Sequence, residues 1–185
     1  MAADTVAFLK EIVSGPAHLV GWSDGGIVGL LVALGDAELV RKLAVIGTNF
    51  HYEGVSVTPQ DMSMSADGPE MAFFRSLYEA ASPDGPEHWP VVFDKVIRMW
   101  TTSPTLTVGD VARIVTPTLV LVGDDDMPRL SHTTAMFEAL PNGQLAVVPG
   151  ASHAVPMEKP QQVNQLILEF LSSGEPETML PIRRR

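Results

Sequence analysis

Three groups of polar residues have the types and the order needed for nucleophilic catalysis, and the first surrounds Ser23. Gly21-Trp22-Ser23-Asp24-Gly25 fits the pattern Gly-x-Ser-x-Gly, in which a strand turns sharply into a helix and lifts a serine hydroxyl above a sheet. The glycines are expected because side chains two residues either side of the serine would collide with the backbone. A dinucleotide-binding turn, Gly-x-Gly-x-x-Gly, is excluded because Ser23 stands at the place of the second glycine. The segment predicts a nucleophilic serine.

The second group contains the base that such a serine needs. His153 ends the segment Pro149-Gly150-Ala151-Ser152-His153, between the last predicted strand and the last predicted helix. This position corresponds to the C-terminal rim of a parallel sheet, where such sheets place their ligands. His132 begins a predicted helix and suits the role less well. The remaining histidines, which lie in a strand or in the irregular middle of the chain, are His18, His51 and His88.

The third group supplies the acid that orients the base. It should follow the strand predicted at 118–122, where the chain reads Gly123-Asp124-Asp125-Asp126. Spacing alone leaves the choice among the three carboxylates open. A cation site is the alternative interpretation, but no other cluster of ligands accompanies these acids.

Alternating strands and helices are expected to position these groups. Apolar periodicity predicts strands at 17–20, 43–46, 118–122 and 144–148, and helices at 5–13, 27–34, 108–114, 131–140 and 160–171. Strands that alternate with helices in this way indicate an α/β fold, with a mostly parallel sheet and helices on both faces.

The alternation breaks in the middle of the chain, which predicts a small helical lid inserted at 49–105. The core would then comprise 1–48 and 106–172, and 173–185 would be a flexible tail. Two apolar stripes are expected in the lid, to line an apolar pocket or to pack on the sheet. Their members are Met71, Phe74, Leu77 and Tyr78, and Val92, Phe93, Val96, Ile97 and Trp100.

Composition limits the classes of function. The 185 residues include 12 basic and 22 acidic side chains, a net charge of -10 that argues against a nucleic-acid partner. The basic run Arg183-Arg184-Arg185 is interpreted as a solvated tail. With no cysteine there is no disulfide or thiolate metal site, and we expect neither metal nor cofactor. The longest apolar stretch, 27–34, is too short to span a bilayer, and no signal peptide is evident. These features predict a soluble, cytoplasmic protein.

Together, residues 19–26, 122–126 and 150–153 resemble the α/β-hydrolase superfamily. The Trp-Ser-Asp-Gly-Gly elbow is most similar to valacyclovir hydrolase-like (biphenyl hydrolase-like) members, and the resemblance runs from about Thr5 to Leu171. In the family the acid lies three residues after the strand-ending glycine, so the resemblance selects Asp126. It therefore implies a catalytic triad of Ser23, Asp126 and His153, with Asp124 and Asp125 shaping the turn.

The elbow residues beside the serine are expected to contact the substrate. The backbone N–H of Asp24 would donate to the oxyanion. The resemblance associates an acid at this position with a substrate ammonium group, and a carboxylate pointing into the pocket would favour a cation. The alternative for Asp24 is an exposed acid stabilised by the helix N-terminus. Trp22 and Asp24 are thus the predicted substrate-binding residues.

The sequence departs from the family before the elbow. A complete member has several strands there and a His-Gly loop that supplies a second oxyanion N–H, whereas only one helix precedes Ala17. The strand at 17–20 would then have an unpaired edge. An N-terminally shortened chain, a partner chain that completes the sheet, or an edge covered by the first helix would each account for this.

Two classes of function follow from these observations. The first is a carboxylesterase-like serine hydrolase that acts on small esters, amides or lactones through a Ser-His-Asp triad and an acyl-enzyme. The second is a catalytically weak or inert truncated hydrolase-like domain that self-associates as a homodimer through its open sheet edge. A haloperoxidase-type activity would use the same triad.

Overall fold

A four-stranded parallel sheet forms the centre of the protein. The computed structural model describes residues 1–59, 61–174 and 178–182, and Arg183-Arg184-Arg185 lie outside this part. The strands, in spatial order β1-β2-β3-β4, are β1 (Ala17–Trp22), β2 (Val40–Ile46), β3 (Thr118–Asp125) and β4 (Gly143–Ser152). All four predicted strands are present, and the α/β fold class is confirmed.

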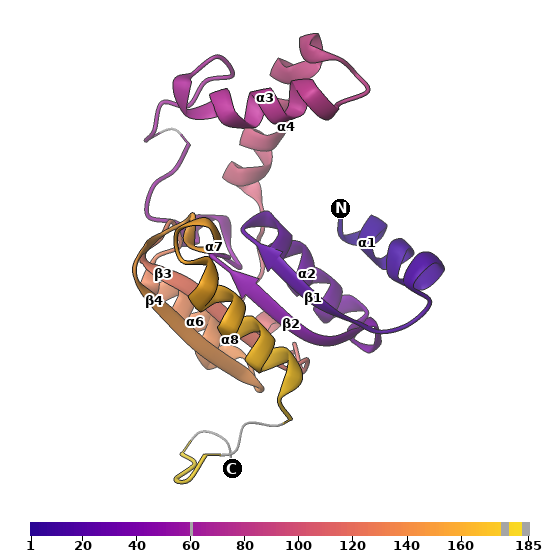
Figure 1. Cartoon of the computed structure of the whole chain (residues 1–185), viewed down its shortest axis with the longest axis vertical. Helices are drawn as coiled ribbons and strands as arrows, with labels where there is room; N and C mark the ends of the chain where they lie inside the picture. The colour runs from indigo at the N-terminus through magenta and orange to yellow at the C-terminus, as the bar shows by residue number, and fades with distance from the viewer. Residues whose placement is uncertain (60, 175–177, 183–185) are drawn as a thin grey trace.

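Helices cover both faces of the sheet (Figure 1). They are α1 (Ala2–Phe8), which continues as a π-helical turn (Leu9–Val13), α2 (Asp24–Gly35), α5 (Val108–Val111), α6 (Leu130–Ala139), α7 (Val155–Glu158) and α8 (Pro160–Ser172). The predicted helix at 108–114 is shorter than expected, and α7 is a helix that periodicity did not predict. Short 3₁₀ turns occur at Ala37–Leu39, Tyr52–Gly54, Pro69–Met71 and Pro86–His88.

The alternation of side chains along β2 shows how the core is divided. Leu43 and Val45 pack in the cluster that includes residues of α2 and α6. Ala44 and Ile46 pack in clusters with residues of α8. Successive strand residues point to opposite faces, so the continuous apolar stretch at 43–46 has to be covered on both sides. The stripe predicted on the last helix is confirmed, because Val163, Leu166, Ile167, Phe170 and Leu171 all contact these clusters.

Strand β1 forms an exposed edge of the sheet. It pairs with β2 on one side, and Val20 and Trp22 are 50% and 40% exposed. Helix α1 and the turn after it pack Val6 and Leu9 on the cluster that contains α2. The first helix therefore does not cover the C-terminal half of β1, where Val20 and Trp22 lie, and the expectation that it covers this edge is wrong there.

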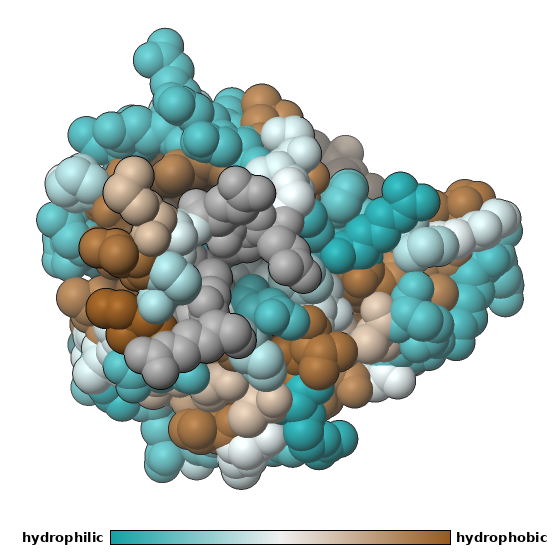
Figure 2. Space-filling view, turned by 90° about the horizontal axis from the view of Figure 1, so that it is seen from below, coloured by the Kyte–Doolittle hydropathy of each residue, from teal (hydrophilic) through white to brown (hydrophobic). Residues whose placement is uncertain are grey.

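The insertion at 49–105, called the lid below, stands above the carboxyl ends of the strands and contains α3 (Ala72–Ala81) and α4 (Trp89–Thr102) (Figure 1). Three of its buried side chains, Met71, Trp89 and Phe93, form a cluster of their own, whereas Phe50 packs in the core cluster with α2 and α6. The predicted stripe on α3 is not fully buried, because Phe74 and Leu77 are about half exposed. The opposite end of the molecule is a mosaic of hydrophobic and hydrophilic residues (Figure 2).

The two ends of the lid meet where they leave the core. His51 and Thr105 form an antiparallel bridge, and the Leu106 N–H donates to the Phe50 carbonyl over 3.0 Å. The ring of His132, on α6, stacks on Phe50 with 3.9 Å between centroids, and its Nε2 accepts the Phe50 N–H at 3.2 Å. Nε2 can accept this bond only when it carries no proton. Burial lowers the pKa of His132 from 6.5 to about 4.

The protein should therefore lose stability in mild acid through His132. Above about pH 6.5 the ring is neutral in the folded and the unfolded chain. Between about pH 6.5 and 4 the unfolded chain binds a proton that the folded chain excludes, so the free energy of unfolding falls as the pH falls. The free energy of unfolding should be measured by urea denaturation at several pH values. As the pH falls, it should decrease less steeply in His132→Asn than in the parent protein.

His18→Asn is the matched control, since it removes an exposed histidine from β1. It should keep the pH dependence of the parent. An unchanged slope in His132→Asn would mean that this ring does not set the acid sensitivity of the fold.

Candidate active site

Ser23 lies at the sharp turn between β1 and α2. Its backbone has φ 55° and ψ -121°, a positive φ that is uncommon outside glycine and that signals a constrained turn. The Ser23 N–H donates to the Ile46 carbonyl at the end of β2 over 2.8 Å. The carbonyl of Ser23 accepts from the N–H groups of Gly26 and Ile27 in the first turn of α2. These bonds hold the serine at the carboxyl edge of the sheet.

The steric reason given for the elbow glycines is only half right. A Cβ at Gly21 would overlap the backbone of Gly25 and Gly26, so a side chain is excluded there. A Cβ at Gly25 would meet no atom within 4 Å, so the expected collision at this position is wrong. The second tight position is Gly26, where a Cβ would overlap the side chain of Thr48. Helix α2 can pack against the segment after β2 because Gly26 has no side chain.

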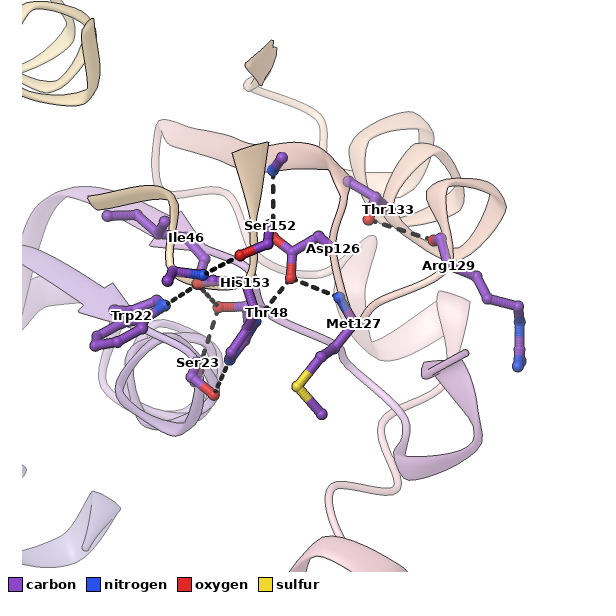
Figure 3. A network of polar contacts seen from close by, with 12 residues as sticks. Trp22, Ser23, Ile46, Thr48, Asp126, Met127, Arg129, Thr133, Ser152 and His153 are labelled. Atoms are coloured by element: carbon purple, nitrogen blue, oxygen red, sulfur yellow. Dashed lines mark hydrogen bonds and ion pairs between the residues drawn. The ribbon is translucent and has the colours of Figure 1, made fainter. Parts of the chain in front are cut away.

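Ser23, His153 and Asp126 form a continuous chain of hydrogen bonds (Figure 3). The Nδ1 of His153 lies 2.7 Å from Oδ1 of Asp126, and Nε2 lies 3.0 Å from Oγ of Ser23. An ionised carboxylate can only accept, so Nδ1 carries the proton and Nε2 of the neutral ring is free to accept from the serine hydroxyl. The three residues come from the ends of β1, β3 and β4.

The Asp126 carboxylate is held from three directions. Its side chain has 0% exposure. Oδ2 accepts from the Gly123 N–H at 3.2 Å, and Oδ1 accepts from the Met127 N–H at 2.7 Å as well as from His153. Hydrogen bonds from backbone amides stabilise the negative charge in a buried position. The aspartate can therefore orient the imidazole and balance a positive charge on it.

The loop that carries His153 is fixed by two other acids. Oδ1 of Asp124 accepts from the N–H groups of Gly150 and Ala151, at 2.7 and 3.2 Å. Glu158 accepts from the N–H and the hydroxyl of Ser152, at 2.7 and 2.8 Å. The N–H bond from Ser152 lowers the pKa of the Glu158 carboxyl below its ordinary value. Asp124, near the end of β3, thus joins this strand to the end of β4 that leads into His153.

Trp22 and Asp24 flank the serine, and each has a defined partner. The indole N–H of Trp22 donates to the carbonyl of His153 at 2.8 Å, and the two rings lie 5.8 Å apart at 38°. The carboxylate of Asp24 accepts from the indole N–H of Trp100, on α4 of the lid, at 2.8 Å. Asp24 is the first residue of α2. Its backbone N–H therefore has no carbonyl partner within the helix.

His132, the other histidine considered as the catalytic base, lies where the lid joins the core and accepts a hydrogen bond from the Phe50 N–H. Across residues 1–59, 61–174 and 178–182 no group of three or more metal-binding side chains is close enough to hold an ion. The same residues include no helix with the length and hydropathy of a membrane span.

Gly47 is a residue of this site that the sequence analysis missed. It follows β2 with φ +56°, and a Cβ there would lie 3.0 Å from Nδ1 of His153 and 3.1 Å from Oδ2 of Asp126. The glycine thus leaves room for the His–Asp pair. A glycine directly after a predicted strand was the available signal, since parallel strands bring their carboxyl ends to one edge.

Gly47→Ala should therefore disturb the His–Asp pair. The positive φ strains alanine, and the added methyl forces His153 or Asp126 to shift. We expect labelling of Ser23 by a serine-directed phosphonate to slow by about a hundredfold, the effect of a misplacement of about 1 Å. Gly35→Ala, which adds a methyl in open space, is the control. Equal labelling rates in folded Gly47→Ala and parent would contradict this prediction.

Comparison with known proteins agrees with this architecture. Serine hydrolase BPHL from Mus musculus is 25% identical over an alignment 185 positions long, which covers 92% of this chain and 60% of BPHL. This chain therefore spans less than two thirds of the length of that relative.

Solved structures show the same fold. The meta-cleavage product hydrolase CumD from Pseudomonas fluorescens IP01 superposes with a TM-score of 0.74 at 20% identity, over 92% of this chain and 70% of CumD. An enol-lactonase from Burkholderia xenovorans LB400 gives a TM-score of 0.68 at 17% identity, over 93% of this chain and 72% of the lactonase. The sequence pattern of the Alpha/beta hydrolase family matches residues 1–166. With that match over most of its length, the chain belongs to the α/β-hydrolase family.

Proposed function

We propose that this protein is a serine hydrolase that cleaves small esters, amides or lactones through an acyl-enzyme. The observation that carries the proposal is the hydrogen-bonded series in which Nε2 of His153 lies 3.0 Å from Oγ of Ser23 and Nδ1 lies 2.7 Å from Asp126. A nucleophile, a base and an orienting acid in this geometry are the parts that acyl transfer requires. Membership of a hydrolase family supports the same chemistry.

The acylation step follows from this arrangement. Nε2 of His153 takes the hydroxyl proton of Ser23 while Oγ attacks the carbonyl carbon of the substrate, and the carbonyl oxygen becomes an oxyanion. The buried Asp126 balances the charge of the imidazolium. The imidazolium then gives its proton to the leaving alcohol or amine as the carbon–heteroatom bond breaks. Ser23 is left as an acyl ester.

Deacylation repeats the sequence with water. His153 removes a proton from water, the hydroxide attacks the acyl carbon, and the proton passes to Oγ as the acid is released. The N–H of Asp24, at the start of α2, donates to the oxyanion in both steps. The positive end of the helix dipole adds to the same effect.

Substrate contacts are assigned to the residues either side of the serine. Trp22 is 40% exposed and its ring is adjacent to that of His153, so it offers an apolar surface beside the base. The carboxylate of Asp24 is directed to the lid by its bond to Trp100, which favours the interpretation as a substrate-facing acid over that of a solvated helix-start acid. Substrates that carry an ammonium group should therefore bind well here.

The proposal predicts that hydrolysis depends on Ser23. With p-nitrophenyl acetate as substrate, Ser23→Ala should lower kcat/KM by about a thousandfold or more, because the nucleophile is lost and only binding and the oxyanion donor remain. Circular dichroism should show that both proteins are folded. Ser131→Ala, which removes an exposed hydroxyl from α6, is the control and should retain the parent rate. Equal background rates in folded parent and Ser23→Ala would refute the hydrolase proposal.

A second function is favoured by the exposure of β1. Val20 and Trp22 remain 50% and 40% exposed on a strand that pairs on one side only. An apolar edge strand is a template for another strand. The alternative is a weakly active or inert hydrolase-like domain that self-associates as a homodimer through β1.

Self-association through β1 would be abolished by a charge at the edge. In sedimentation analysis the parent should behave as a dimer, and Val20→Lys should behave as a monomer because an edge lysine opposes strand addition. Val147→Lys, at a 40% exposed position of β4 on the other edge of the sheet, should remain dimeric. A monomeric parent protein would exclude this alternative.

A further inference from the structure

A tryptophan of the lid is bonded to the residue that follows the proposed nucleophile. The indole N–H of Trp100 donates to Oδ2 of Asp24 at 2.8 Å. Trp100 lies near the C-terminal end of α4, and Asp24 is the first residue of α2. Figure 1 shows the lower end of α4 directly above the core. The bond thus links the lid to the nucleophile turn.

The Asp24 carboxylate has a competing position without this bond. The first N–H groups of a helix lack carbonyl partners and attract negative charge. In α2 those groups include the N–H of Asp24 itself, which the proposed function assigns to the oxyanion. A carboxylate turned towards this end of the helix would compete for the donor and repel the developing negative charge. Both effects would raise the barrier to acyl transfer.

We propose that Trp100 is a positioning residue, which holds the Asp24 carboxylate against the lid and so keeps the start of α2 available for the oxyanion. This inference rests on the proposed hydrolase function. It assigns to the lid a role in the chemical step in addition to covering the site. Trp100 acts through Asp24 and has no direct role in proton transfer.

The contacts of Trp100 indicate a positioning role and not a role in packing the lid. The lid's own cluster contains Trp89, whose indole N–H donates to the Ala66 carbonyl within the lid at 2.7 Å. Trp100 is outside that cluster, and its indole N–H is directed to the core. Two tryptophans of the same helix therefore make the same kind of hydrogen bond, one internal to the lid and the other to the elbow.

The test is a double-mutant cycle with neutral p-nitrophenyl acetate. Trp100→Phe removes the donor and keeps an aromatic ring, and kcat should fall by about tenfold, the size expected for one hydrogen bond to a charged group. KM should change little, because the interaction serves the transition state. In an Asp24→Ala background no carboxylate remains to be held, so adding Trp100→Phe should leave kcat unchanged.

Trp89→Phe is the matched control, and it should have the same effect on kcat whether Asp24 is present or replaced by alanine. A variant with β-(3-benzothienyl)alanine at position 100, which has the shape of tryptophan and no N–H, gives the same test if Trp100→Phe does not fold. Equal losses of kcat from Trp100→Phe in both backgrounds, with turnover that still requires Ser23, would overturn the role of Trp100 alone. Turnover that persists in Ser23→Ala would overturn the proposed function with it.

Discussion

A carboxylate with no exposed surface must find its hydrogen-bond partners inside the protein, and Asp126 is such a group. It accepts from the N–H groups of Gly123 and Met127 and from the ring of His153. An unpaired buried charge costs far more than any one of these bonds returns. The turn after β3 and the loop after β4 therefore have to lie against each other, and this requirement fixes where the imidazole points.

The close approach of backbone segments at the sheet edge is the second requirement. A Cβ at Gly123 would overlap the carbonyl of Ala151, and one at Gly47 would press on the His–Asp pair. Gly21 and Gly26 have the same role between β1, α2 and Thr48. Each position lacks a side chain where two elements must come closer than a methyl group allows. Ser23, His153 and Asp126 are thus brought together because these positions have no side chain.

Local patterns were enough to predict much of this arrangement. The strands were predictable because each is mostly apolar. The strands that precede the serine, the acid and the histidine also follow one another across the sheet in chain order. Phe74 and Leu77 share the predicted stripe but remain about half exposed, because periodicity cannot say whether a short helix finds a second surface to pack against. The bond from Trp100 to Asp24 joins residues 76 positions apart and leaves no local signal. The tight position at Gly26 depends on the distance to Thr48 and was equally hidden.

The backbone is paired at the point where the lid leaves and rejoins the core. Phe50 and Leu106 are joined by a backbone hydrogen bond, and His51 pairs with Thr105. The two ends of the insertion are therefore neighbours whatever lies between them, and the entropy of closing such a loop grows only with the logarithm of its length. Recombination or laboratory exchange could substitute helices of another length or polarity at this junction while the sheet below keeps its register. An exchanged insertion would also have to supply a donor to the Asp24 carboxylate in place of Trp100.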